Sequence, residues 1–112
     1  MDRRALVAHY TTIADRSPIP IILYNVPAST GVDPSAETLI ELAGHPSIVG
    51  LKESSGNVIK IGQVLHSAGD SFQVLAGSGN FLLPALAVGA MGGVMALASV
   101  APHGLHEIVI SF

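Results

Sequence analysis

The sequence predicts an α/β fold with a parallel sheet. Four short apolar runs, at residues 20–26, 48–52, 72–76 and 93–98, do not alternate strictly with polar residues, which is typical of strands buried on both faces. Segments with helical periodicity separate these runs, and successive runs start roughly 20 to 28 residues apart. Alternating strands and helices imply parallel strands joined by right-handed crossovers.

Helix boundary signals support this order. The opening helix is expected to stop near Ser17-Pro18. Asp33 is a candidate N-cap before Pro34 at the first position of a second helix, which Gly44 closes. The predicted helices cover 5–13, 34–43, 58–65 and 81–88, and a fifth begins near Pro102. A flavodoxin-like or dinucleotide-binding sheet would also satisfy the pattern, although the G-x-G-x-x-G fingerprint is absent.

The composition indicates more apolar surface than an isolated domain of this size needs. Hydrophobic residues make up 49% of the 112 residues and charged residues 12%, against about 25% charge in an average soluble domain. Missing sequence, a partner subunit or a membrane would cover that surface. The net charge of −3 gives no basic footprint for nucleic acid. The absence of cysteine excludes disulfides and thiolate metal sites.

Residues 81–101 carry no charge and are long enough to span a bilayer. Pro84 and a glycine cluster at 89–93 interrupt the stretch, and basic flanking anchors are absent. A buried helix followed by a buried parallel strand has the same composition. We therefore expect no membrane partner.

Lys52 ends the second predicted strand and is one of two lysines. The other, Lys60, is expected on a solvated helix face. Enzymes of this architecture place their chemistry at the C-terminal ends of parallel strands. Burial there lowers the pKa of a lysine from about 10.4, and a neutral amine can attack a carbonyl carbon and form an iminium. The alternative for Lys52 is an ion pair with Glu53 at the strand end.

Tyr24 lies near the end of the first predicted strand. Adjacent parallel strands are about 4.8 Å apart, so equivalent strand ends would place Tyr24 and Lys52 in one pocket. A phenol there could pass protons to and from a substrate. The alternative is an aromatic core residue whose hydroxyl contacts solvent.

Two further features suggest ligands weakly. The loop 77–80 follows the third strand and opens a helix, so its backbone amides could hold a phosphate or carboxylate, as in a small anion-binding module, or simply connect elements. His103 and His106 have the spacing of a metal-binding pair, but no acidic third ligand accompanies them, so a surface role is expected.

Two motifs in order resemble the paired signature of the dihydrodipicolinate synthase/N-acetylneuraminate lyase family of Schiff-base aldolases. They are YNVPASTG at 24–31 and VGLKES at 49–54, and the spacing between tyrosine and lysine also fits. The resemblance continues through FQVLAG at 72–77 and GGV at 92–94. It therefore covers essentially the whole chain.

The resemblance implies a role for each matching residue. Lys52 matches the Schiff-base lysine, Tyr24 the proton-relay tyrosine, and Gly77 and Val94 positions whose backbone lines the substrate pocket. The strands would be strands 5 to 8 of a (β/α)₈ (TIM) barrel, preceded by helix 4, with residues 1–112 forming one incomplete domain. No metal or cofactor is expected, because the protonated iminium is itself the electron sink.

Within this family the loop after the tyrosine separates two activities. Synthases usually carry an arginine there, which binds the carboxylate of the second substrate, and here the position is Ser29. The runs 17–20, 28–31 and 72–78 look more like 4-hydroxy-2-oxoglutarate aldolases, in which Ser54 matches a pocket serine. We therefore expect cleavage of a 4-hydroxy-2-oxo acid to pyruvate and an aldehyde, with 4-hydroxy-tetrahydrodipicolinate synthase as the alternative.

A full family member has about 300 residues, so strands 1 to 4 and their Gly-Thr-Thr-Gly-Glu type loop are expected to lie outside this chain. Activity is then expected only within a complete barrel, and the alternative is a catalytically silent fragment. The resemblance also implies a homo-oligomer that binds a small 2-oxo acid. An intracellular location follows from it, without distinguishing cytoplasm from mitochondrion.

Overall fold

Four parallel strands form one sheet in which spatial order follows chain order, β1-β2-β3-β4. A computed structural model describes residues 2–112. The strands are β1 (Ile21–Asn25), β2 (Ile48–Glu53), β3 (Gln73–Ala76) and β4 (Gly92–Gly93). The expected α/β class, the parallel pairing and the existence of four strands are confirmed.

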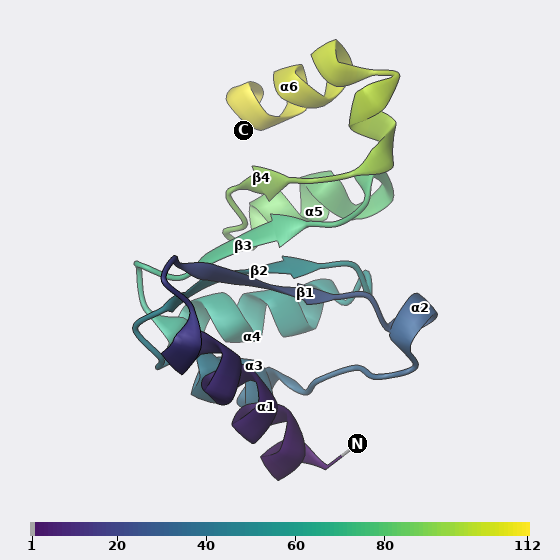
Figure 1. Cartoon of the computed structure of the whole chain (residues 1–112). Helices are drawn as coiled ribbons and strands as arrows, with labels where there is room; N and C mark the ends of the chain where they lie inside the picture. The colour runs from purple at the N-terminus through teal and green to yellow at the C-terminus, as the bar shows by residue number, and fades with distance from the viewer. Residues whose placement is uncertain (1) are drawn as a thin grey trace.

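Helices connect and flank these strands (Figure 1). They are α1 (Arg3–Arg16), α2 (Pro27–Thr30), α3 (Ala36–Ala43), α4 (Val58–Ala68), α5 (Leu82–Ala87) and α6 (Pro102–Ser111), with 3₁₀ turns η1 (Gly79–Phe81) and η2 (Ala96–Ser99). In Figure 1, α3 and α4 lie along β1 and β2, α5 lies beside β3 and β4, and α6 lies beyond β4.

Local signals explain where α3 and α4 begin. The Ser35 hydroxyl accepts a hydrogen bond from the Thr38 amide at 3.3 Å, and the Asn57 side-chain oxygen Oδ1 accepts one from the Lys60 amide at 3.0 Å. Each cap satisfies an amide that has no partner inside its helix. The expected start at Asp33-Pro34 is wrong, because α3 begins two residues later and the Asp33 carboxylate binds other side chains instead.

The core lies between the sheet and its helices. Leu23, Leu51 and Val74 occupy neighbouring positions on the covered face and are almost completely buried against residues such as Leu39 and Ile61. Each such side chain contributes about 1.5–3 kcal/mol of burial free energy. These contacts hold the strands of the candidate site against α3 and α4.

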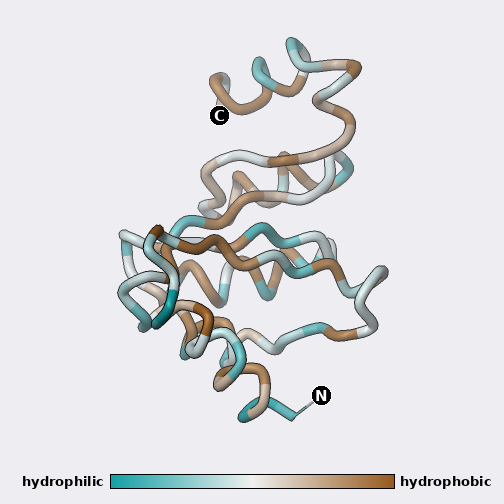
Figure 2. Tube along the Cα trace, in the orientation of Figure 1, coloured by the Kyte–Doolittle hydropathy of each residue, from teal (hydrophilic) through white to brown (hydrophobic). Residues whose placement is uncertain are grey.

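The other face of the sheet is not covered by the residues described. Ile22 and Tyr24 alternate with buried neighbours in β1 and are 52% and 50% exposed. Figure 2 shows apolar positions along the strands and again along α6. The expectation of strands buried on both faces is therefore wrong for this chain taken alone.

The last predicted strand is much shorter than expected. Only Gly92 and Gly93 pair with β3, and residues 96–99 turn into η2 instead of continuing the strand over 93–98. The uncharged stretch 81–101 is thereby divided among short elements. No helix among residues 2–112 is both long and apolar enough to cross a membrane.

Candidate active site

Tyr24 and Lys52 lie side by side on the open face of the sheet. They are register partners near the C-terminal ends of β1 and β2. The Lys52 Nζ atom lies 4.0 Å from the centroid of the Tyr24 ring, a geometry in which the π-system attracts an ammonium group. The structure thus brings together the two residues that the sequence placed in one pocket. The alternative of a core tyrosine is wrong, because half of the side chain is exposed.

The expected alternative for Lys52, an ion pair with Glu53, is also wrong. Consecutive side chains of a strand point to opposite faces, so Glu53 faces the helices while Lys52 faces the open side. The Glu53 carboxylate instead lies 3.1 Å from Lys60 Nζ. The Lys52 amine is therefore available on the open face.

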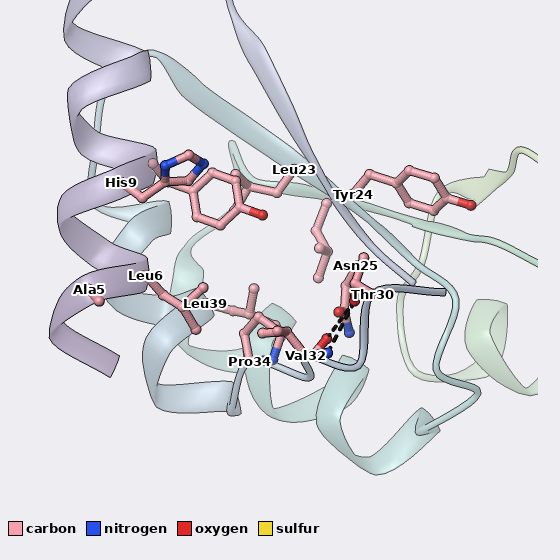
Figure 3. A pocket seen from close by; sticks show the side chains of 12 residues that line it. Ala5, Leu6, His9, Leu23, Tyr24, Asn25, Thr30, Val32, Pro34 and Leu39 are labelled. Carbon is pink, nitrogen blue, oxygen red and sulfur yellow. Dashed lines mark hydrogen bonds between the residues drawn. The ribbon is translucent and has the colours of Figure 1, made fainter. Parts of the chain in front are cut away.

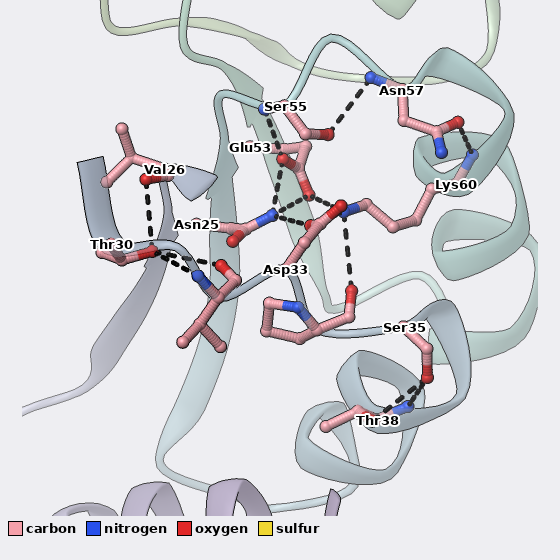
Figure 4. Close-up of polar contacts among 12 residues, drawn as sticks. Asn25, Val26, Thr30, Asp33, Ser35, Thr38, Glu53, Ser55, Asn57 and Lys60 are labelled. Atoms are coloured by element: carbon pink, nitrogen blue, oxygen red, sulfur yellow. Dashed lines mark hydrogen bonds and ion pairs between the residues drawn. The ribbon is translucent and has the colours of Figure 1, made fainter. Parts of the chain in front are cut away.

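Four polar residues form a cluster on the helix side of the sheet, which we call the buried cluster: Asn25, Asp33, Glu53 and Lys60 (Figure 4). Glu53 is 0% exposed, and Asn25 and Lys60 are 5% exposed. The side chain of Asp33 is 47% exposed and lies at the solvent-facing rim of the cluster. Asn25 Nδ2 donates to the two Glu53 oxygens at 2.9 and 3.0 Å and to Asp33 Oδ1 at 2.7 Å. The expectation of a solvated Lys60 is wrong, because its ammonium group lies among these acceptors.

The carboxyl group of Asp33 responds to this setting. Burial alone would raise its pKa, but hydrogen bonds from Lys60 and Asn25, together with the positive charge of Lys60, outweigh burial. The net effect holds the pKa of Asp33 below its ordinary value of 3.8. The folded chain therefore favours the carboxylate form of Asp33.

Ser54 and Gly77 contact each other just beyond the ends of β2 and β3. A Cβ atom at position 77 would lie 1.7 Å from Ser54 Oγ, so only glycine leaves room for this hydroxyl. Within the described part of the chain the buried Ser54 Oγ has no hydrogen-bond partner. An unpartnered buried hydroxyl is unfavourable, and a ligand oxygen near the strand ends would satisfy it.

The two remaining candidate residues lie at separate points. Ser29 is exposed on α2, the single turn after β1, and its amide bonds to the Val26 carbonyl at 2.9 Å. Val94 follows β4, and its amide donates to the Ala76 carbonyl at 2.9 Å. α2 itself was not anticipated from the sequence.

The loop 77–80, for which the sequence left open an anion site or a simple connection, leads into a short turn. Gly79 begins a 3₁₀ turn instead of an α-helix, and Ser78 makes no capping hydrogen bond through its side chain. A Cβ at position 79 would lie 2.8 Å from a methyl group of Leu97, so η2 packs closely against this loop. Across residues 2–112 no group of three or more His, Cys, Asp or Glu side chains could hold a metal ion.

A pocket of about 390 Å³ lies beside the exposed edge of β1. Leu6 and His9 of α1, Leu23 of β1 and Leu39 of α3 are among its lining residues. In Figure 3 the Tyr24 side chain extends from β1 on the side away from α1. Tyr24 also contributes to the lining, but Lys52 does not.

The chain consists of parallel β/α units with a lysine and a tyrosine at matched strand ends. Its sequence matches the model of the dihydrodipicolinate synthetase family over residues 1–111, so the chain belongs to that family. A 4-hydroxy-tetrahydrodipicolinate synthase from Exiguobacterium sp. is 47% identical over 87% of this chain and 33% of its own length. The synthase from Geobacter metallireducens is 41% identical over 98% of this chain and 38% of its length.

Solved structures agree with this assignment. Dihydrodipicolinate synthase from Aquifex aeolicus matches with a TM-score of 0.93 and 36% identity, covering 99% of this chain and 38% of that one. The chloride-inhibited enzyme from Acinetobacter baumannii, complexed with pyruvate, matches with a TM-score of 0.91 and 32% identity, covering 99% and 39%. The chain thus spans between a third and two fifths of the length of these relatives.

The comparisons refine the expected activity. The relatives described above are synthases, which supports the alternative of the sequence analysis better than its main expectation of a 4-hydroxy-2-oxoglutarate aldolase. The buried cluster was not anticipated from the sequence. Strand alternation could have placed Asn25 and Glu53 together behind Tyr24 and Lys52, but no local signal pointed to Lys60.

Proposed function

We propose that this chain supplies the Schiff-base half of a 4-hydroxy-tetrahydrodipicolinate synthase, with Lys52 as the amine that binds pyruvate. The observation that carries the proposal is the Lys52 amine, 4.0 Å from the Tyr24 ring centroid at matched strand ends. The synthase names of the relatives and the pyruvate complex of one of them support the substrate class.

The chemistry begins at the 2-oxo carbon of pyruvate. Once it has lost a proton, the Lys52 amine adds to this carbon, and the Tyr24 hydroxyl transfers protons as the carbinolamine loses water to form an iminium. Loss of a proton from the neighbouring methyl group gives an enamine, whose carbon adds to the aldehyde of the second substrate. Hydrolysis of the product iminium then frees Lys52.

The other candidate residues would surround this centre. Ser54 offers its unpartnered hydroxyl to a substrate oxygen, and the backbone at Gly77 and Val94 lines the pocket in this proposal. Ser29 would contribute from α2 on the side of the second substrate. The reaction needs no metal or cofactor, because the iminium nitrogen accepts the electron pair.

A second candidate reaction is the reverse type, cleavage of 4-hydroxy-2-oxoglutarate to pyruvate and an aldehyde. Ser29 favours it, because the resemblance expects an arginine at this position in synthases. A hydroxyl group lacks the positive charge and the paired N–H donors with which arginine binds a carboxylate. Both reactions use the same Lys52 iminium.

The proposal includes the assembly in which the site works. We place β1 to β4 as strands 5 to 8 of a (β/α)₈ barrel and residues 1–112 as one incomplete domain, which forms the Lys52 iminium alone but completes the reaction only beside the complementary strands. A homo-oligomer of complete barrels is the corresponding quaternary state. One similar structure is described as a monomeric synthase variant.

Borohydride trapping with pyruvate tests the proposal. The folded chain is incubated with pyruvate and sodium borohydride and then examined by intact mass and peptide mapping. A pyruvyl adduct on Lys52 and none on Lys60 is the expected result, with Lys52→Arg as the control that abolishes it. A folded chain that forms no adduct would reject autonomous Schiff-base chemistry and favour the silent fragment.

The same method separates the two reactions. With 4-hydroxy-2-oxoglutarate in place of pyruvate, an aldolase site cleaves the substrate, so the trapped adduct has the pyruvyl mass. A synthase site would trap the intact substrate or nothing. Because Lys52 is common to both, this comparison reports only on the reaction after iminium formation.

A further inference from the structure

The candidate active site and the buried cluster occupy opposite faces of the same strand ends. Tyr24 and Asn25 are consecutive in β1, and Lys52 and Glu53 are consecutive in β2. The register pairs Tyr24 with Lys52 and Asn25 with Glu53. Because alternate side chains point to opposite faces, any movement of the buried pair moves the exposed pair with it.

The Glu53 carboxylate connects four parts of the chain. Beyond Asn25 of β1, it accepts a hydrogen bond from the amide of Ser55 at 2.7 Å and lies 3.1 Å from Lys60 Nζ of α4. Lys60 Nζ in turn donates to Asp33 Oδ1 at 2.5 Å, and Asp33 belongs to the loop that leads to α3. The ends of β1 and β2 are therefore tied to α4 and to this loop.

The pairing of β1 with β2 is irregular between Ile21 and Ile22, which face Ile48 and Gly50 respectively. It becomes regular from Ile22 to the Asn25–Glu53 pair. A slip of β1 by one residue along β2 would take Asn25 away from Glu53 and leave this buried carboxylate without one of its hydrogen-bond donors. Burying a charge that has lost a partner is costly, so the buried cluster disfavours such a slip.

We propose that the buried cluster is a positioning device for the candidate active site, which holds the ends of β1 and β2 in the register that sets the Lys52 amine against Tyr24. The effect of the cluster on catalysis rests on the function proposed above. Its effect on the position of Lys52 does not, because the position of the Lys52 side chain over an aromatic ring can be measured without any substrate.

The decisive variant removes both buried charges together. Replacing a buried ion pair by apolar residues of similar size is often neutral or stabilising, whereas removing one partner is strongly destabilising. Glu53→Met combined with Lys60→Met therefore retains a folded chain while the ties are lost. The control is Arg3→Met combined with Glu41→Met, which removes an exposed ion pair of 2.6 Å between α1 and α3.

Nuclear magnetic resonance of lysine labelled with ¹³C at the ε-carbon supplies the structural readout. The Tyr24 ring current shifts the Lys52 ε-proton signal upfield, and Lys52→Arg assigns it. We expect this shift in the parent chain and in the control, and its loss in the Glu53/Lys60 double variant. The rate of pyruvate trapping should fall in parallel by up to about 100-fold, since a misplacement of about 1 Å can have that effect.

Each outcome decides one question. A folded double variant that keeps the upfield shift and the trapping rate would overturn the positioning role, as would a parent chain without the shift. A parent chain that shows the shift but traps no pyruvate would reject the proposed function, while loss of the shift in the double variant would still support positioning. If the double variant unfolds, Asn25→Leu, which removes the tie between β1 and Glu53 but leaves the Glu53–Lys60 ion pair in place, is read in the same way.

Discussion

At the scale of single residues, close packing just beyond the strand ends requires glycine at position 77. Gly77 leaves the space that the Ser54 hydroxyl fills, and its amide donates a hydrogen bond to the Glu53 carbonyl at 2.8 Å. The smallest residue thus keeps a hydroxyl oriented near the strand ends. The same carbonyl would lie 3.0 Å from a Cβ at position 77.

Gly77→Ala tests this packing. The added methyl group would overlap Ser54 Oγ and approach backbone, so we expect a loss of about 1–3 kcal/mol in the free energy of unfolding. Urea denaturation measures it. Adding Ser54→Gly removes the overlapping atoms and should restore part of the loss. Equal stability of Gly77→Ala and the parent chain would show that the segments that follow β2 and β3 move apart at little energetic cost.

Asp33 predicts a pH dependence of stability. Its pKa is lower in the folded chain than its ordinary value of 3.8, so the unfolded chain binds more protons in that interval. The stabilisation from Asp33 is complete above the ordinary value and is lost as the pH falls through the lower folded value. The measurement is the melting temperature of Asp33→Asn and of the parent between about pH 2.5 and 7. The two melting temperatures should converge at the acidic end of this range.

The control for this measurement is Glu107→Gln, which removes a carboxylate from an exposed position of α6. It changes the net charge by the same amount without touching the buried cluster. If the difference in melting temperature between the parent and Asp33→Asn stays constant across the whole pH range, the proposed pairing of Asp33 with Lys60 and Asn25 is contradicted.

At the scale of elements, helices and strands whose boundaries are set by nearby residues were predictable, and those set by distant contacts were not. α1, α4 and α6 were predicted because their starts and stops are local, as with Asn57 before α4 and Pro102 at the start of α6. The end of β4 could not be predicted, because residues 96–99 are apolar in either conformation and tertiary packing makes them a 3₁₀ turn. Lys60 was misplaced because its partner Asp33 lies 27 positions away.

The cap of α4 gives a prediction at this scale. Asn57→Ala removes the acceptor of the Lys60 amide, a hydrogen bond of 3.0 Å. The expected cost is about 1 kcal/mol in the free energy of unfolding, measured by urea denaturation. Asn80→Ala, at an exposed position in η1, is the matched control and should have little effect. A smaller loss in the free energy of unfolding for Asn57→Ala than for Asn80→Ala would show that the Asn57 cap does not stabilise α4.

At the scale of the whole molecule, one covered face and one open face define the behaviour of this chain. The candidate active-site pair was predictable because two tied motifs placed it at matched strand ends. The half-exposed state of Tyr24 was not predictable, because the strand pattern carries no information about which chains cover the sheet. The open face therefore combines reactive groups with apolar side chains that water contacts.

This open face predicts association of the chain with itself. β1 and β4 have edges that no other strand pairs with among residues 2–112, and Ile22 of β1 is 52% exposed beside the first of these edges. Unpaired edges and exposed apolar side chains favour pairing with another chain.

Sedimentation velocity should show an average mass that rises with concentration. Ile22→Lys places a charge on the open face and should lower that mass without lowering the melting temperature, because Ile22 contributes little to the buried core. A chain that stays monomeric over the whole concentration range would mean that its open face is protected by local rearrangement.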